Sequence, residues 1–218
     1  SMKREKLFSK KTIFVFMILV TGGTGLVGSH LLYKLVSNGA SVRAMYRRPH
    51  KLEFVKKVFA YYTDEAETLY NKIEWIEANI NDIPSLEAAF TSITHVYHCA
   101  AFISFEPNKY QELRKINIKG TANIVNLCIS NHIKKLCYIS SIAAIGQEPH
   151  EDTLITEKTE WNPEADNSVY AITKYGAEME VWRGTQEGLD AVIVNPGIIL
   201  GPGFWKGNGS GSLFRQIH

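Results

Sequence analysis

The sequence predicts an α/β fold in which helices cover both faces of a parallel β-sheet. Short apolar runs, which predict strands, alternate along the chain with amphipathic stretches, which predict helices. The apolar runs are nearly continuous, as expected for strands that are buried on both faces. A length of 218 residues with 45% hydrophobic residues suits one large domain or a domain and a half.

The elements follow one another without an internal repeat. The first strand is predicted at 17–23, and the first helix at 29–39 ends at Gly39, because glycine commonly closes the last turn of a helix. The other predicted strands are 41–46, 73–80, 94–101, 135–144 and 189–196. The other predicted helices are 51–72, 85–93, 110–132 and a stretch that begins at residue 168. This order indicates crossover helices between parallel strands.

The charge is nearly balanced, with 24 Lys and Arg against 22 Asp and Glu residues. Because the basic residues are spread along the chain, we expect a small-molecule partner and neither nucleic acid nor a membrane. Cys99, Cys128 and Cys137 form no C-x-x-C pair, and at least one of them must stay unpaired. This cysteine usage predicts reduced thiols and a cytoplasmic location. No metal site is predicted.

The first 20 residues imitate a signal peptide, since a basic stretch precedes the apolar run 13–20. That run is only eight residues long, lacks a small-residue cleavage site and leads into a glycine-rich segment, so it predicts a buried strand. Ser1 and Met2 are typical of an expression tag, and Met17 is a candidate natural start. We therefore expect residues 1–16 to be a tag-derived or N-terminal extension outside the fold.

The segment TGGTGLVG, residues 21–28, lies between the first predicted strand and the first predicted helix. Its glycines fit either Gly23, Gly25 and Gly28 or Gly22, Gly25 and Gly28. Both patterns let the backbone approach a pyrophosphate, whose charge the helix N-terminus stabilises. The segment thus predicts a Rossmann-type, doubly wound dinucleotide-binding domain. The expected cofactor contacts here are Gly22, Thr24, Gly25, Leu26, Val27 and Gly28.

The end of the second predicted strand indicates which dinucleotide binds. NAD-binding proteins normally place Asp or Glu there for the ribose 2′-hydroxyl, whereas this chain has Arg47 and Arg48. A guanidinium binds a 2′-phosphate in bidentate fashion. We therefore expect NADP as the cofactor in preference to NAD.

Five further segments carry a resemblance to a known family: HCAA at 98–101, NIKGT at 117–121, ISSIAAIG at 139–146, YAITK at 170–174 and NPGIILGPG at 195–203. In this order and spacing the chain from residue 17 to 218 resembles the extended short-chain dehydrogenases/reductases, and among them the dihydroflavonol 4-reductase-like branch. The resemblance implies an NAD(P)-binding Rossmann domain at 17–200. Residues 201–218 would then begin a substrate-binding lobe that is largely absent from this chain.

The resemblance also implies a reaction centre of Ser141, Tyr170 and Lys174, supported by Asn117. Ser140 is the alternative to Ser141, but alternation along a strand turns its side chain to the other face. Tyr170 and Lys174 are four residues apart on one helix face, so we expect the ammonium to lie near the phenol and to lower its pKa. Tyr170 would act as acid and base while a nicotinamide exchanges hydride with the substrate.

The resemblance also implies the remaining site residues. The further cofactor contacts are Asp82, Ile83, Ala100, Ala101, Pro196 and Gly197, besides Tyr170 and Lys174. Substrate contacts are expected at Phe102, Ser141 and Tyr170, and the neighbouring Ile103 and Phe105 suggest an apolar or aromatic substrate. His98 ends a buried strand, where a structural role is the more usual one.

The reaction class follows from what adjoins this centre. Sugar dehydratases of the family carry an Asp-Glu pair where this chain has Ile142 and Ala143, so elimination of water is not expected. We expect an NADP-dependent reductase or dehydrogenase acting on a carbonyl or secondary alcohol. The alternatives are a nucleotide-sugar epimerase that retains NAD and a non-catalytic NADP-binding sensor or scaffold. The resemblance further suggests a homodimer formed through helices near 109–132 and 168–187.

Overall fold

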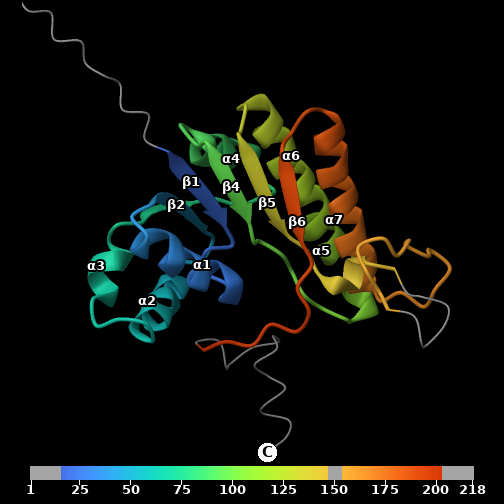
Figure 1. Ribbon diagram of the computed structural model, residues 1–218, viewed down its shortest axis with the longest axis horizontal. Coiled ribbons are helices and arrows are strands. Elements are labelled where there is room, and N and C mark those ends of the chain that lie inside the picture. Colours follow the sequence, from blue (N-terminus) through green and yellow to red (C-terminus); the bar gives the residue numbers. More distant parts are fainter. Residues whose placement is uncertain (1–15, 147–153, 203–218) are drawn as a thin grey trace, which may run out of the picture.

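The fold is described here from a computed structural model, over residues 16–146 and 154–202. Its centre is a six-stranded sheet in which every neighbouring pair of strands is parallel, in the order β3-β2-β1-β4-β5-β6 (Figure 1). The strands are β1 (Met17–Thr21), β2 (Ser41–Tyr46), β3 (Glu74–Glu77), β4 (His95–His98), β5 (Lys135–Ile139) and β6 (Ala191–Val194). This order confirms the doubly wound Rossmann architecture. The strand order reverses between β1 and β4, and in such sheets the crevice at that point binds the ligand.

Helices cover both faces of the sheet, as expected (Figure 1). They are α1 (Leu26–Ser37), α2 (Leu52–Ala60), α3 (Ala66–Tyr70), α4 (Ile83–Phe90), α5 (Tyr110–Leu113), α6 (Gly120–Ser130) and α7 (Val169–Gln186). Adjacent residues of one strand enter different cores because strand side chains alternate. On β1, Val20 packs with α1 and α2, whereas Leu19 packs with α4 and α6. Both β1 side chains are fully buried, which explains the continuous apolar run.

Two predicted helices differ from the structure. The predicted helix 51–72 is divided into α2 and α3, because the amides of Tyr62 and Thr63 both donate to the carbonyl of Phe59 and end the first helix there. The Thr63 hydroxyl then accepts from the amide of Glu65, the kind of local bond that favours a turn. The predicted helix 110–132 is present, but residues Arg114–Lys119 form a π-helical turn inside it.

The strands are shorter than their apolar runs. The run 135–144 leaves the sheet after Ile139 and continues into a 3-10 turn at Ile142–Ala144.

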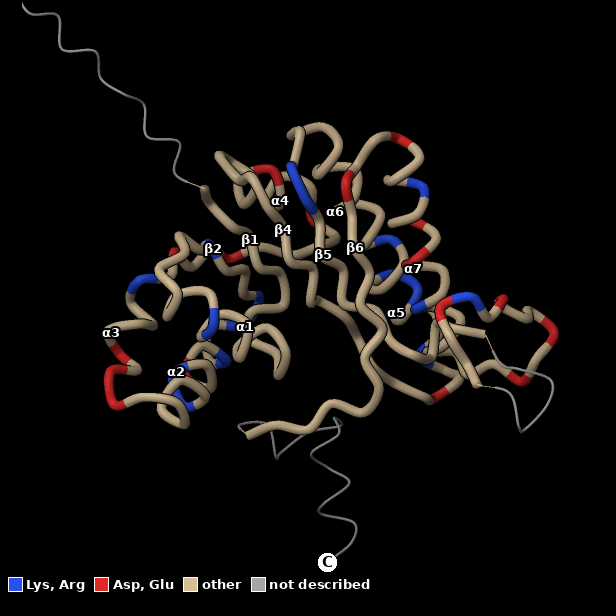
Figure 2. Tube along the Cα trace, viewed as in Figure 1, with Lys and Arg blue, Asp and Glu red and all other residues tan. Residues whose placement is uncertain are grey.

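Charged residues are distributed over the helices and loops with both signs interspersed (Figure 2). Within residues 16–146 and 154–202, no helix combines the length and apolar character needed to cross a bilayer. The three cysteines are free thiols.

Candidate active site

The glycine segment forms a tight turn between β1 and α1. Gly22 has φ +67°, and a Cβ there would lie 2.6 Å from the amide nitrogen of Ala100. A Cβ on Gly28 would clash with the carbonyl oxygen of Gly22, and the amide of Gly25 donates to that same carbonyl at 2.9 Å. Gly23 instead packs toward Leu32 in the core. The geometry therefore favours the pattern Gly22, Gly25 and Gly28.

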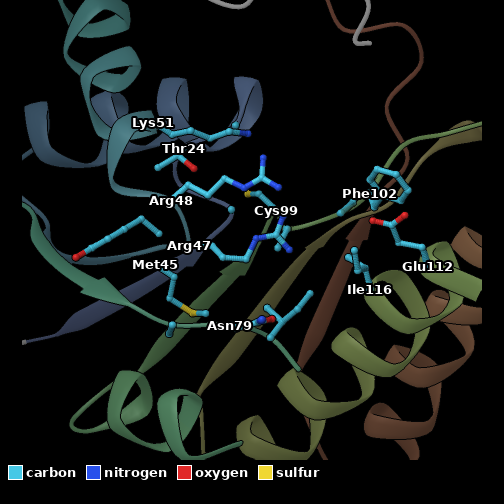
Figure 3. A pocket seen from close by; sticks show the side chains of 17 residues that line it. Thr24, Met45, Arg47, Arg48, Lys51, Asn79, Cys99, Phe102, Glu112 and Ile116 are labelled. Carbon is cyan, nitrogen blue, oxygen red and sulfur yellow. The ribbon is translucent and has the colours of Figure 1, made fainter. Parts of the chain in front are cut away.

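A cavity of about 350 Å³ opens beside this turn (Figure 3). Its walls are Gly22, Thr24, Gly25, Met45, Tyr46, Arg47, Arg48, Lys51, Ala78, Asn79, Ile80, Cys99, Ala100, Ala101, Phe102, Glu112 and Ile116. Most of these residues lie at or just after the carboxyl ends of β1, β2, β3 and β4, where a doubly wound sheet binds its ligand, while Glu112 and Ile116 come from α5 and the π-helical turn. A turn in which glycines let the backbone come close to a ligand, and a cavity of this size, fit a dinucleotide.

Three cations gather at one end of the cavity. Figure 3 shows Arg47, Arg48 and Lys51 directed toward it from the end of β2 and the turn that follows. Partial burial, and then the positive charges of Arg48 and Arg47, lower the pKa of Lys51. Lys51 was not among the expected contacts. The sequence could have indicated Lys51, because it belongs to the same basic stretch as Arg47 and Arg48. The 3-10 turn at Pro49–Lys51 directs the chain back toward the cavity.

Two expected cofactor contacts lie elsewhere. Asp82 is the N-cap of α4, where its Oδ2 accepts from the amide of Ser85 at 3.3 Å, and Ile83 is 41% exposed in the first turn of that helix. The cavity wall is formed by Asn79 and Ile80 instead. The reason is that β3 ends at Glu77, so residues 78–80 lie at the edge of the sheet and the chain has already turned into α4 at residue 82.

The other expected cofactor residues are placed as follows. Ala100 and Ala101 line the cavity. Leu26 and Val27 lie in the first turn of α1 and are half-buried, outside the lining set. Pro196 and Gly197 follow β6, away from the cavity and beside the Ser141 segment, where the Pro196 carbonyl accepts from the amide of Ile142 at 3.1 Å.

Ser141 and Tyr170 come together from β5 and α7. Ser141 directly follows β5, and its Oγ accepts from the amide of Ala143 at 3.1 Å. Tyr170 lies in the first turn of α7, is 8% exposed and has the ring of Phe105 edge-on at 5.5 Å. Burial raises the pKa of Tyr170, and its hydrogen bond with Ser141 opposes that rise only in part. The pKa of the phenol is thus raised, where we expected it to be lowered.

The reason is the position of the ammonium. Lys174 is 1% exposed, and its Nζ donates to the hydroxyl of Tyr138 at 2.8 Å and to the carbonyl of Ile139 at 3.0 Å. Its charge is therefore held by β5 rather than by Tyr170. Burial lowers the pKa of Lys174 to about 8, against the opposing effects of Glu178 and Cys99. Tyr138 is a partner that no local pattern in the sequence indicated.

Asn117 lies in the π-helical turn and is 1% exposed. Its Oδ1 accepts from the amide of Phe102 at 2.8 Å, and its Nδ2 donates to the carbonyl of Phe102 at 3.0 Å and to the Thr173 hydroxyl at 3.1 Å. π-helical turns are common at functional sites. Asn117 thus supports the site by fixing Phe102 and α7, and its hydrogen bonds do not reach Tyr170 or Lys174.

His98 has a structural position, as expected. Its ring nitrogens pair with the hydroxyls of Thr21 at 2.7 Å and Thr121 at 3.0 Å, and its ring stacks on Tyr138. Burial, and then the charge of Lys174, lower the pKa of His98 to about 3. Because both nitrogens are satisfied and the ring is neutral, His98 holds β1, β4 and α6 together.

Comparison with known proteins agrees with this architecture. The chain is 31% identical over 202 residues to a putative dihydroflavonol 4-reductase of Synechocystis, covering 91% of this chain and 53% of that protein. It is 29% identical to tetraketide alpha-pyrone reductase 2 of Arabidopsis thaliana, covering 84% and 59%. A short-chain dehydrogenase/reductase superfamily protein from Agrobacterium tumefaciens, solved with bound NAD, superposes with a TM-score of 0.66 at 25% identity, covering 82% and 48%.

The chain spans about half the length of the curated relatives it matches. A sequence model of the NAD dependent epimerase/dehydratase family matches residues 18–217. The sheet order, the glycine turn and this match agree, and the chain belongs to the NAD dependent epimerase/dehydratase family, with the fold of the extended short-chain dehydrogenases/reductases.

Proposed function

We propose that the protein is an NADP-dependent oxidoreductase that reduces a carbonyl group, or oxidises the matching secondary alcohol, of a small apolar or aromatic substrate. The observation that carries this proposal is the meeting of Ser141 with a buried, protonated Tyr170, in a fold whose glycine turn borders a cavity at the carboxyl ends of the strands. Residues 17–200 would form the cofactor domain, and residues from 201 onward would begin the substrate lobe; residues 1–15 and 203–218 lie outside the described part of the chain.

The raised pKa of Tyr170 suits a proton donor. When a carbonyl is reduced, its oxygen needs a proton, and a neutral phenol held by Ser141 supplies one. Ser141 would hydrogen-bond the same oxygen and orient it. Bound NADPH would supply the hydride. Lys174, charged at neutral pH and buried one turn from Tyr170, would stabilise the phenolate left behind and bind the nicotinamide ribose.

The preference for NADP is supported by the three cations Arg47, Arg48 and Lys51. Burial, and then the charges of Arg48 and Arg47, lower the pKa of Lys51, and a 2′-phosphate would relieve the repulsion among the three cations. None of the cavity-lining residues at the end of β2 is an Asp or Glu that would favour a 2′-hydroxyl. The apolar substrate is supported by Phe102 in the cavity wall and by Ile103 and Phe105, which are 46% and 68% exposed nearby.

The first test is a fluorescence titration with NADPH and, in parallel, NADH. We expect NADPH to bind more tightly, and Arg47→Ala to remove the preference while leaving NADH affinity unchanged. Arg114, an exposed arginine of the π-helical turn, supplies the control variant Arg114→Ala. Equal binding of the two cofactors would overturn the NADP assignment and favour the retained-NAD epimerase reading.

The second test separates an enzyme from a sensor or scaffold. Tyr170→Phe removes only the hydroxyl, so NADPH affinity should persist while the oxidation of NADPH by aromatic aldehydes and ketones is lost. A Tyr170→Phe variant with undiminished turnover would remove Tyr170 from its proposed role.

An apolar stripe on α7, with Ile172, Met179 and Trp182 38% to 51% exposed, supports the proposal that α6 and α7 pair in a homodimer. Sedimentation of Trp182→Asp against the unchanged chain tests that pairing.

A further inference from the structure

Glu178 is a buried carboxylate to which the proposed reaction assigns no role. It is 8% exposed on α7, and none of the ion pairs between described residues includes it. Its Oε1 accepts a hydrogen bond from Nδ2 of Asn195. Burying a carboxylate without a contacting cation costs free energy, and a glutamine would accept the same bond without that cost. The negative charge itself therefore calls for an explanation.

The position of Glu178 gives one. It lies four residues after Lys174 in the same helix, so the two Cβ atoms are neighbours on one face, about 5–6 Å apart. Both side chains are buried against the sheet. Asn195, directly after β6, donates from the same amide nitrogen to the carbonyl of Ser141 at 3.0 Å. The hydrogen-bonded chain from Glu178 through Asn195 to the Ser141 carbonyl ties the carboxylate to the end of β5, where the ammonium donates to the carbonyl of Ile139.

Within the part of the chain that the structure describes, no other group that faces the ammonium carries a negative charge at neutral pH. From β5 it meets the Tyr138 hydroxyl, whose pKa burial raises. His98, at the end of β4, is neutral, and burial raises the thiol pKa of Cys99, which directly follows β4, to about 12. Tyr170, one turn earlier in the same helix, has a raised pKa as well. Among the described residues, Glu178 is thus the one anion placed to offset the burial of the ammonium.

We propose that Glu178 is a positioning residue: its buried carboxylate, held by Asn195, keeps Lys174 in the charged form. Only the use of the Lys174 charge in catalysis rests on the proposed function; the effect of Glu178 on that charge does not. If it holds, the cation of the reaction centre depends on an anion one helical turn away that touches neither substrate nor cofactor. An opposite charge in this position raises the pKa of an amine.

The test follows the Cε resonance of Lys174 against pH by NMR in the chain labelled with ¹³C-lysine, and Lys174→Arg assigns the signal. We expect the midpoint in Glu178→Gln to fall by roughly one pH unit or more, the effect of removing a close opposite charge. Glu180→Gln is the matched control, since Glu180 lies on the same helix but pairs with Arg183; its midpoint should equal that of the unchanged chain.

A second variant guards against misfolding. Glu178→Met replaces the buried charge by an apolar side chain of similar volume, an exchange that proteins often tolerate, and it should lower the midpoint as well. An unchanged midpoint in folded Glu178→Gln or Glu178→Met would overturn the inference. The titration needs neither cofactor nor turnover, so it stands even if NADPH binding fails. If the midpoint falls but the pH profile of NADPH oxidation stays the same, the positioning role of Glu178 is supported. The same result would count against the proposal that the Lys174 charge stabilises the Tyr170 phenolate.

Discussion

The buried ammonium of Lys174 makes the stability of the protein depend on pH in a direction that can be worked out. Burial lowers its pKa from 10.5 to about 8, which corresponds to roughly 3 kcal/mol of unfavourable free energy for the charged native state. Below pH 8 both the native and the unfolded chain hold the proton, so this cost is fully present. Between pH 8 and 10.5 the native lysine loses its proton while the unfolded one keeps it. The contribution of Lys174 to the free energy of unfolding therefore rises with pH.

The perturbation is Lys174→Met, which keeps an unbranched stem and removes the titrating group. Urea unfolding, followed by tryptophan fluorescence at pH 7 and pH 9.5, measures the free energy of unfolding of both chains. Relative to the variant, the unchanged chain should gain about 2 kcal/mol between these pH values, because other titrating groups cancel in the difference. Lys34→Met, at an exposed lysine of α1, is the control and should follow the unchanged chain. Equal pH dependence in Lys174→Met and the unchanged chain would refute the assignment of a buried, charged lysine.

Three further predictions concern other parts of the site. Gly28→Ala should abolish NADPH binding and lower the melting temperature, since the added Cβ meets the Gly22 carbonyl; retained affinity in a titration would contradict the glycine-turn geometry. His98→Gln should lose less stability in acid than the unchanged chain. Between pH 7 and pH 5 the free energy of unfolding of the unchanged chain should fall by roughly 2 kcal/mol more than that of the variant. The reason is that the unfolded histidine becomes protonated in this range, whereas the native one, with a pKa of about 3, stays neutral. Urea unfolding at the two pH values measures this difference, and parallel losses would show that His98 is not buried as described. Asn117→Ala should destabilise the protein by roughly 2–4 kcal/mol, because it leaves both backbone groups of Phe102 without their partner; thermal unfolding checks this, and a change below 1 kcal/mol would mean that water replaces the amide.

The sequence by itself determined the α/β class, the glycine turn and the basic end of β2. Each of these depends on neighbours in the chain: the apolar runs that alternate with helical stretches, the closely spaced glycines of residues 21–28, and the adjacent Arg47 and Arg48. Such local structure follows from the hydrophobic periodicity of the sequence and from the backbone conformations that glycine can adopt and other residues cannot.

Only the tertiary structure decided which groups surround the reaction centre. The sequence placed Lys174 near Tyr170, but β5 holds its ammonium on Tyr138, 36 residues away in the chain. Asn195 meets Glu178 and Ser141 only because β6 pairs with β5 under α7. Such contacts depend on strand register and helix packing, which no local pattern specifies. The pKa values follow from burial in that packing, so the sequence could name the titrating residues but not the direction in which their pKa values shift.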